Sequence, residues 1–302
     1  MTAPGAASRR GAVTLALLLV VGCTAADRDG QSSGSSSTGP DGRSATSSAS
    51  APPVSPGAAA ADGTSTSADV EPSPETPLEG ACYDLTLDEV TEPTSDHPPV
   101  PCADTHTTRT IHVGLLDTVV DGHLLAVDSA VAQEQVVESC SSRFARHVGG
   151  GERGRELSRL QVVWFSPTLE QSDRGATWFR CDVVLLGRPG ALAPLPRRLD
   201  GILTRPGASE VVGLCGTAAP GTAAFERVVC SLPHSWKAMS TIPLADGRYP
   251  GVAAVRRAGE STCRDRVRRA STNPERFRYG WEWPTREQWQ AGQRFGYCWA
   301  PD

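Results

Sequence analysis

Two short motifs place a cysteine and a histidine at the same spacing, Cys102-x-x-x-His106 and Cys230-x-x-x-His234. Cysteine thiolates and histidine nitrogens bind zinc, and a cysteine beside a histidine can also act as a nucleophile. A zinc site needs about four ligands, and neither motif has a second such pair close by. We therefore expect no metal and no cofactor. The recurrence makes His106 and His234 candidates for a shared polar site, although a ring hydrogen-bonded inside the fold is the simpler interpretation.

The cysteines predict two copies of one small unit. The chain has nine cysteines, and all except Cys23 fall into two sets of four. The sets are Cys82, Cys102, Cys140 and Cys181, then Cys215, Cys230, Cys263 and Cys298. In an exported protein such even sets predict disulfides. Trp164-x-x-Pro167 stands as far before its last cysteine as Trp281-x-x-Pro284 does, and this shared spacing indicates a repeat.

Each copy is expected to contain the same elements in the same order. Apolar periodicity predicts, in the first copy, strands at 108–116, 160–164 and 177–186, a helix at 128–147 and a short capped helix from 167. The second copy gives a strand with its loop at 227–242, strands at 277–283 and 295–299, and helices at 252–270 and 285–290. The predicted fold class is α+β, with two tandem small disulfide-stabilised domains. Each is a short, three-stranded antiparallel sheet with one main helix.

This order of elements favours one of the pairings that four cysteines allow. Cys140–Cys181 and Cys263–Cys298 would fix the main helix to the last strand, and Cys82–Cys102 and Cys215–Cys230 would close the loop before the first strand. Each disulfide is expected to stabilise the fold by roughly 2–4 kcal/mol. The domains extend over 80–187 and 210–302, and a linker rich in proline and arginine joins them at 188–209.

Residues 1–22 have the features of a bacterial lipoprotein signal peptide. Two arginines precede an apolar run that is too short to span a bilayer, and the run ends in Val20-Val21-Gly22-Cys23, which resembles a lipobox. We expect a lipid on Cys23, and therefore anchoring to the cell membrane on its extracytoplasmic face. The alternative is an ordinary signal peptide followed by a stray cysteine. Residues 23–79 are rich in Ser, Thr, Ala and Pro and predict a disordered tether.

Two tryptophans of the second copy are not required by the repeat. Trp283 aligns with Ser166 and Trp289 with Ser172, so the common core does without these rings. Exposed aromatic side chains often bind protein partners or sugars. We therefore expect Trp283 and Trp289 on a surface that is specific to the second copy.

Charge separates the two copies. Residues 82–187 contain 16 acidic residues and eight arginines, a formal charge of −8. Residues 210–302 contain nine acidic residues, 12 arginines and Lys237, a formal charge of +4. The basic excess is centred on the helix around Cys263, where Arg264 and Arg268 are candidate binding residues. Such a helix could bind an anionic polymer, phospholipid headgroups or an acidic partner; it could equally pair with the acidic copy or face solvent.

The sequence carries no common catalytic signature. Gly-x-Ser-x-Gly, His-Glu-x-x-His and the phosphate-binding loop are all missing. We therefore do not expect an enzyme. The alternative is a hydrolase or other enzyme acting on cell-wall polymer, and it requires a concave pocket in which His106 or His234 meets an acidic residue.

These motifs together resemble the septum-formation domain family of actinobacterial envelope proteins. The resemblance rests on the two Cys-x-x-x-His motifs, the helix cysteines Cys140 and Cys263, and the two Trp-x-x-Pro stretches, over about 80–187 and 210–302. It implies a link to cell division or the envelope and supplies no catalytic residues. We expect a binding or scaffold module held on the membrane by its lipid, whose partner is an envelope protein or a cell-wall component and not a nucleic acid.

Overall fold

Three antiparallel strands form the centre of the first sheet. The computed structural model describes residues 76–302, and in it β6 (Trp178–Leu186) lies between β2 (Thr108–Leu115) and β5 (Leu160–Phe165). Two short strands extend the sheet, since β1 (Cys82–Tyr83) pairs with β2 and β7 (Leu192–Ala193) pairs with the end of β6. Strand β6 is buried along nearly its whole length, as expected for a central strand covered on both faces.

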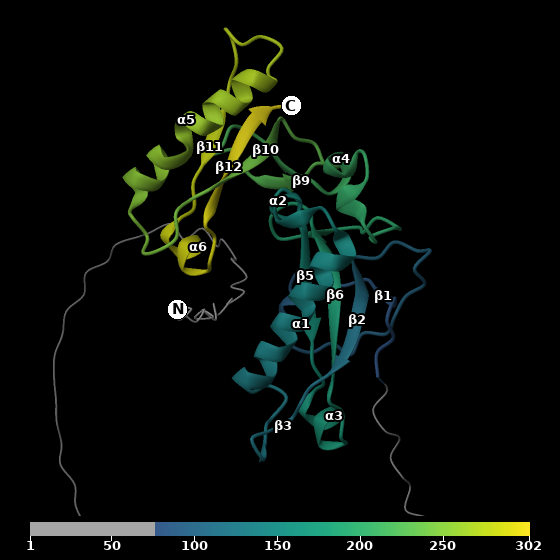
Figure 1. Cartoon of the computed structure of the whole chain (residues 1–302). Helices are drawn as coiled ribbons and strands as arrows, with labels where there is room; N and C mark the ends of the chain where they lie inside the picture. The colour runs from purple at the N-terminus through teal and green to yellow at the C-terminus, as the bar shows by residue number, and fades with distance from the viewer. Residues whose placement is uncertain (1–75) are drawn as a thin grey trace, which may run out of the picture. The chain divides into compact units, whose positions relative to one another are not determined.

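Helix α1 (Ala130–Val148) lies along β5 and β6 (Figure 1). The hydroxyl of Ser129 caps its first turn by accepting a hydrogen bond from the Ala132 amide. Every fourth residue from Ala132 is apolar and buried, which makes one stripe that faces the sheet. The buried stripe consists of Ala132, Val136, Cys140, Phe144 and Val148.

Short elements complete the first half. A 3₁₀ turn (Glu89–Thr91) precedes β2, and helix α2 (Gly151–Glu156) follows α1. Strands β3 (Val119–Val120) and β4 (His123–Leu124) form a hairpin between β2 and α1. Its turn residues, Asp121 and Gly122, have positive φ angles of 52° and 78°, as a tight two-residue hairpin turn requires. Helix α3 (Leu169–Asp173) begins with a capping box.

The second sheet has the order β11-β12-β10-β8-β9. Its central strands are β12 (Phe295–Pro301) and β10 (Trp236–Pro243), flanked by β11 (Gly280–Glu282) on one side. Strands β8 (Leu214–Gly216) and β9 (Arg227–Val229) extend the other side. Helix α5 (Val252–Ala270) packs on the sheet and has the predicted bounds. Helix α6 (Arg286–Gln290) begins with a capping box, like α3.

The indole of Trp281 packs closely against α5. A Cβ atom on Gly259 would stand 2.2 Å from Cζ2 of Trp281, which is closer than real atoms approach. The indole Nε1 of Trp281 donates a hydrogen bond to the Val255 carbonyl, one turn earlier, at 3.4 Å. The absence of a side chain at Gly259 therefore determines how closely α5 approaches the sheet.

The two sheets repeat one another in register. Cys181 of β6 lies opposite Trp164, and Cys298 of β12 lies opposite Trp281. Each central pairing also has an irregularity at the corresponding place, between Thr110 and His112 of β2 and between Ala238 and Ser240 of β10. The order β2-β6-β5 thus corresponds to β10-β12-β11.

Three details differ from the prediction. Both sheets have five strands rather than three, because two-residue and three-residue edge strands are too short to show a periodic pattern. Strand β11 is shorter than the predicted 277–283. The segment predicted as a linker, 188–209, forms β7, a 3₁₀ turn (Ile202–Thr204) and the start of α4 (Ala208–Val212). Its buried Leu195 and Leu199 belong to the first core, so this segment is part of the fold.

The two halves are joined by hydrogen bonds and by apolar packing. The amide of Arg159 donates to the Val212 carbonyl at 2.7 Å, and the Thr241 hydroxyl donates to Oε2 of Glu156 at 2.6 Å. Val229 of the second sheet is fully buried within the core of the first. All described residues accordingly fall in a single compact unit.

The predictions for residues 1–75 lie outside the described part of the chain. They are the signal peptide at 1–22, the lipid on Cys23 and most of the tether at 23–79. Within residues 76–302, no helix has both the length and the apolar character that a bilayer span requires.

Substituting Gly259 tests the contact between α5 and Trp281. We expect Gly259→Ala to lower the free energy of unfolding by about 1–3 kcal/mol, because the new methyl group must displace the indole. The matched control is Gly154→Ala in α2, where an added Cβ meets no atom within 4 Å. Alanine there should be neutral or stabilising by about 0.5–1 kcal/mol. Urea denaturation of both variants is the measurement, and equal stability would contradict the packing described.

Candidate functional site

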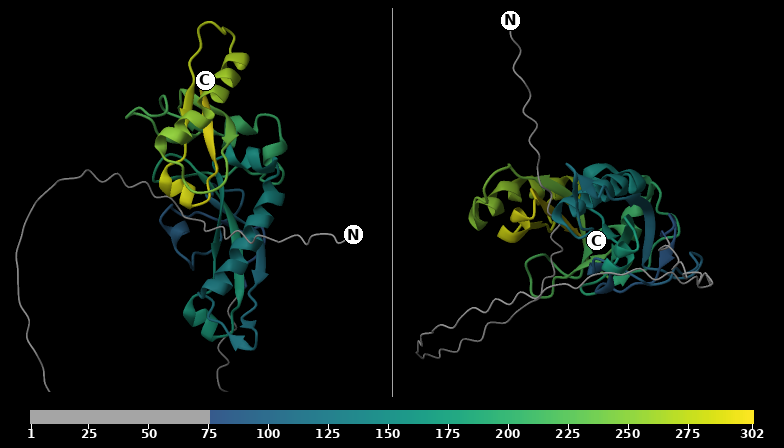
Figure 2. Two further views of the ribbon diagram at one scale, coloured as in Figure 1. Left: turned by 60° about the vertical axis from the view of Figure 1, so that its left-hand side comes forward. Right: turned by 90° about the horizontal axis from the view of Figure 1, so that it is seen from below.

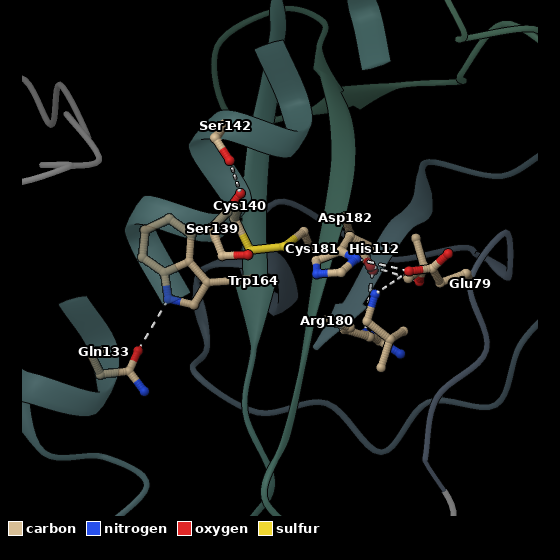
Figure 3. Close-up of a disulfide and its surroundings, with 12 residues drawn as sticks. Glu79, His112, Gln133, Ser139, Cys140, Ser142, Trp164, Arg180, Cys181 and Asp182 are labelled. Carbon is tan, nitrogen blue, oxygen red and sulfur yellow. Dashed lines mark hydrogen bonds and ion pairs between the residues drawn. A yellow bond between two sulfur atoms is a disulfide. The ribbon is translucent and has the colours of Figure 1, made fainter. Parts of the chain in front are cut away.

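Four disulfides hold the framework on which any site must be built. They join Cys82 to Cys102, Cys140 to Cys181, Cys215 to Cys230 and Cys263 to Cys298, which is the pairing predicted from the sequence. Figure 3 shows one of them crossing from α1 to the central strand β6. The corresponding disulfide of the second half joins α5 to β12. Because each long helix is bonded to its sheet at one cysteine, the opposite side of the helix points away from the sheet.

The two histidines that share the Cys-x-x-x-His spacing each form a hydrogen bond within their own loop. Nδ1 of His106 lies 2.9 Å from the carbonyl of Asp104, and Nδ1 of His234 lies 2.7 Å from the carbonyl of Leu232. A carbonyl only accepts, so Nδ1 carries the hydrogen in both rings. The neighbouring Cys102 and Cys230 are in disulfides and supply no thiolate. Among residues 76–302 no group of three or more possible metal ligands occurs.

The two histidines differ in the surroundings of their second ring nitrogen, Nε2. His106 is only 3% exposed, so it does not form a surface site, and its Nε2 has no hydrogen-bond partner. Nε2 of His234 lies 3.3 Å from Oδ2 of Asp302, close to the ion pair between Lys237 and Glu210. The hydrogen bond from Lys237 is the main reason that the pKa of Glu210 is lowered. The structure thus does not bring the two histidines to equivalent surroundings.

A shallow cavity of about 360 Å³ lies on the segment between the sheets. It is lined by Arg197, Arg198, Ile202, Arg205 and their neighbours, and neither His106 nor His234 reaches it. Nη1 of Arg205 is bonded to the carbonyl of Arg198 at 3.3 Å. No histidine and no carboxylate side chain is among the residues that line this cavity.

A buried ion pair that the sequence analysis missed lies in the first sheet. Nε of Arg180 stands 3.4 Å from Oδ2 of Asp182, and both side chains are almost completely buried (Figure 3). The Arg180 guanidinium lies between the rings of Tyr83 and Phe165, at 3.9 and 4.4 Å. Burial raises the pKa of Asp182, while Arg180 and the Thr110 hydroxyl oppose that rise. In the repeat register, Tyr297 and Trp299 of the second sheet take the places of this pair.

The strongest surface feature is the outward side of α5. The helix carries six arginines and two acidic residues, and five of the arginines are exposed: Arg256, Arg257, Arg264, Arg268 and Arg269. The guanidinium of Arg256 lies 5.6 Å from the ring of Trp283, and that of Arg268 lies 5.3 Å from the ring of Phe277. Both rings are half-buried and lie against the second core. We call these five arginines with Trp283 and Phe277 the arginine face.

Arg264 and Arg268 are exposed, whereas Trp289 is buried, so the prediction that Trp289 lies on a surface is wrong. Trp289 is only 4% exposed, and its Nε1 donates to the carbonyl of Gly247 at 2.8 Å. The loop after β10 folds over the indole, and Tyr249 packs against it edge to face. Aligning the two copies could not reveal this, because the loop in the first copy forms the β3–β4 hairpin instead.

The arginine face does not pair with the acidic half of the chain. Arg264 meets its neighbour Asp265 at 3.5 Å. Throughout residues 76–302, no ion pair joins an exposed α5 arginine to an acidic residue of the first half. The interpretation of the basic helix as paired with the acidic half is therefore wrong for residues 76–302, where its five outward arginines are exposed.

The comparison with known families matches this architecture. The model of a family described as septum formation covers residues 79–298. The chain belongs to the septum formation family. A single match spans both sets of four cysteines, so the family description applies to the two halves together. No curated protein and no solved structure matches the chain. Membership suggests a role of this septum formation protein in cell division or the cell envelope.

Counting free thiols tests the four disulfides of this septum formation protein. We expect the native protein to show no free thiol among the eight cysteines of residues 76–302, because every sulfur is paired. Alkylation before and after reduction, followed by mass spectrometry, is the measurement. A reproducible free thiol at Cys102 or Cys230 would contradict the disulfide pairing. It would also place a free thiol next to His106 or His234.

Replacing one member of the buried ion pair is expected to be costly. Asp182→Asn leaves the guanidinium of Arg180 buried without its counter-charge, which should lower the free energy of unfolding by about 3–5 kcal/mol. The double variant Arg180→Met with Asp182→Asn removes the charge as well and should recover part of the loss. Urea denaturation measures both, and a single variant as stable as the double would contradict the pairing.

Proposed function

We propose that this septum formation protein is a lipoprotein that binds an acidic partner at the outer face of the cell membrane. In this proposal Cys23 carries the lipid, residues 23–79 form a tether, and the two four-cysteine halves act as tandem binding modules. The protein would work as a scaffold in the cell envelope or at the septum, and it would bind rather than catalyse.

The disulfides support the location. Four disulfides within one fold persist in an oxidising environment and are rare in the reducing cytosol. An export signal that ends in Val20-Val21-Gly22-Cys23 is consistent with that environment. Anchoring through Cys23 would keep the folded part near the membrane surface.

The arginine face is the single observation that carries the binding function. Two of its guanidinium groups, those of Arg256 and Arg268, lie over aromatic rings, where a carboxylate or phosphate can meet both a fixed cation and an apolar surface. Arginine and tryptophan are also the residues that contribute most to protein interfaces. The partner that fits this surface is an acidic envelope protein or an anionic cell-wall component.

A hydrolase acting on cell-wall polymer is the second candidate. The observation in its favour is the distance of 3.3 Å between Nε2 of His234 and Oδ2 of Asp302, since a histidine beside an acidic residue is the arrangement that this candidate requires. The pair is at the surface, away from the cavity, and its cysteine neighbour is in a disulfide. Binding therefore has the stronger support.

Charge reversal on the arginine face tests the binding function. The variant Arg256→Glu, Arg264→Glu and Arg268→Glu should reduce recovery of the envelope partner on the order of tenfold or more, because each substitution replaces attraction with repulsion. The measurement is the amount of partner that is crosslinked to the full chain in intact cells and recovered with it after the membrane has been dissolved in detergent.

The matched control reverses three exposed arginines elsewhere, with Arg146→Glu, Arg153→Glu and Arg188→Glu. It changes the net charge equally and should leave recovery unchanged. Equal loss in both triple variants would mean that only net charge matters, and it would overturn a specific site on α5. Wall-polymer hydrolysis that disappears with His234→Ala would favour the second candidate.

A further inference from the structure

Exposed apolar side chains collect at one end of the first half. Nine large hydrophobic residues of the described chain are exposed, and five of them come from segments that meet where β2 ends and α1 begins. These five are Leu115, Val119, Leu124, Val131 and Leu169. The views of Figure 1 and Figure 2 agree in placing the β3–β4 hairpin and α3 at this end of the first sheet. We call these five residues the apolar tip.

The tip is held in place by specific bonds. Leu115 lies opposite Trp178 in the last pair of β2 with β6, and Val119 lies opposite Leu124 within the hairpin. The side chain of Gln135 on α1 bonds to both the amide and the carbonyl of Asp117, at 2.9 and 3.0 Å. The hairpin is thus tied to the helix, and Val119 and Leu124 stay 58% and 81% exposed.

The residues around the tip are acidic. From 115 to 135 the sequence has four acidic residues and no lysine or arginine, and α3 with its flanking turn adds two more acids. The only arginine of the tip, Arg174, is paired with Glu170 at 3.0 Å. The exposed acids are Asp117, Asp121, Asp128, Glu134, Glu170 and Asp173.

This combination selects the occupant. Val119 and Leu124 face each other as a cross-strand pair, and exposed aliphatic side chains of this kind are stabilised by burial against a partner. Anionic lipid and anionic wall polymer would be repelled by the acidic rim, as would a second tip in a symmetric contact. The tip therefore requires a partner that is both basic and partly apolar.

The chain itself carries such a surface. On the arginine face, arginines lie over the half-buried rings of Trp283 and Phe277, and Val252 at the start of α5 is 59% exposed. We propose that the apolar tip of one copy binds the arginine face of a second copy. This proposal rests on the proposed function, because it names the acidic partner of the same face.

The contact is between two different surfaces and so does not close on itself as a symmetric dimer does. Each copy that joins keeps one unused tip or one unused arginine face, and further copies add head to tail. The result is a ring or an open row of copies. A row of this kind is a scaffold in the literal sense that the proposed function requires.

Complementation between two variants is the decisive experiment. One variant disables the tip by Val119→Asp and Leu124→Asp, and the other disables the arginine face by Arg256→Glu, Arg264→Glu and Arg268→Glu. Sedimentation velocity of the purified full chain should show association of the native protein, weakened about tenfold or more at high salt. Each variant alone should be monomeric, and an equimolar mixture should form a one-to-one dimer and nothing larger.

The mixture also shows that both variants are folded. A dimer forms only if one variant keeps an intact arginine face and the other keeps an intact tip. A native chain that stays monomeric at all concentrations would overturn the head-to-tail proposal and leave a binding function with another partner intact. A face variant that still dimerises alone would overturn it in favour of a symmetric contact between tips. If the native chain does not self-associate but the arginine-face variant still loses its envelope partner, the head-to-tail proposal fails while the proposed binding function stands.

Discussion

The disulfide between the long helix and the central strand is the constraint on which the rest of the molecule depends. In both halves it joins the middle of the helix to a strand that has neighbours on both sides, opposite a tryptophan. It closes loops of 41 and 35 residues in sequence separation, which limits the unfolded chain. It also fixes the rotation of the helix, and this decides which residues of α5 face solvent.

A fixed framework allows the interiors of the two halves to differ. Strand positions that hold Arg180 and Asp182 in the first sheet hold Tyr297 and Trp299 in the second. A buried ion pair and a pair of aromatic rings fill comparable space, and replacing the first by the second is often neutral in stability. The surfaces diverged as well, because the same connection that forms the β3–β4 hairpin in one half covers Trp289 in the other.

Local sequence information predicts much of this framework and little of its surface. The bounds of α5 and the cap of α3 follow from patterns that are visible in the chain, and the order of the predicted elements favours the cysteine pairs that form. The burial of Trp289, the folding of 188–209 onto the first core and the apolar tip depend on contacts between distant segments. The sequence predicts a linker at 188–209 because this segment is rich in proline and arginine. Both residue types are mostly exposed in proteins, so the composition does not indicate that its few leucines are buried.

The acidic residues of the first half and the exposed arginines of α5 lie in different parts of the fold. If the acidic and basic halves neutralised each other internally, α5 would be bound to the first half, yet its exposed arginines form no ion pair with that half within residues 76–302. Opposite charges kept apart in one molecule favour contacts between molecules. Anchored proteins share a thin layer at the membrane, where the effective concentration is high and a modest affinity is sufficient. On the proposed membrane anchor, a contact too weak to hold dilute copies together would therefore still assemble them.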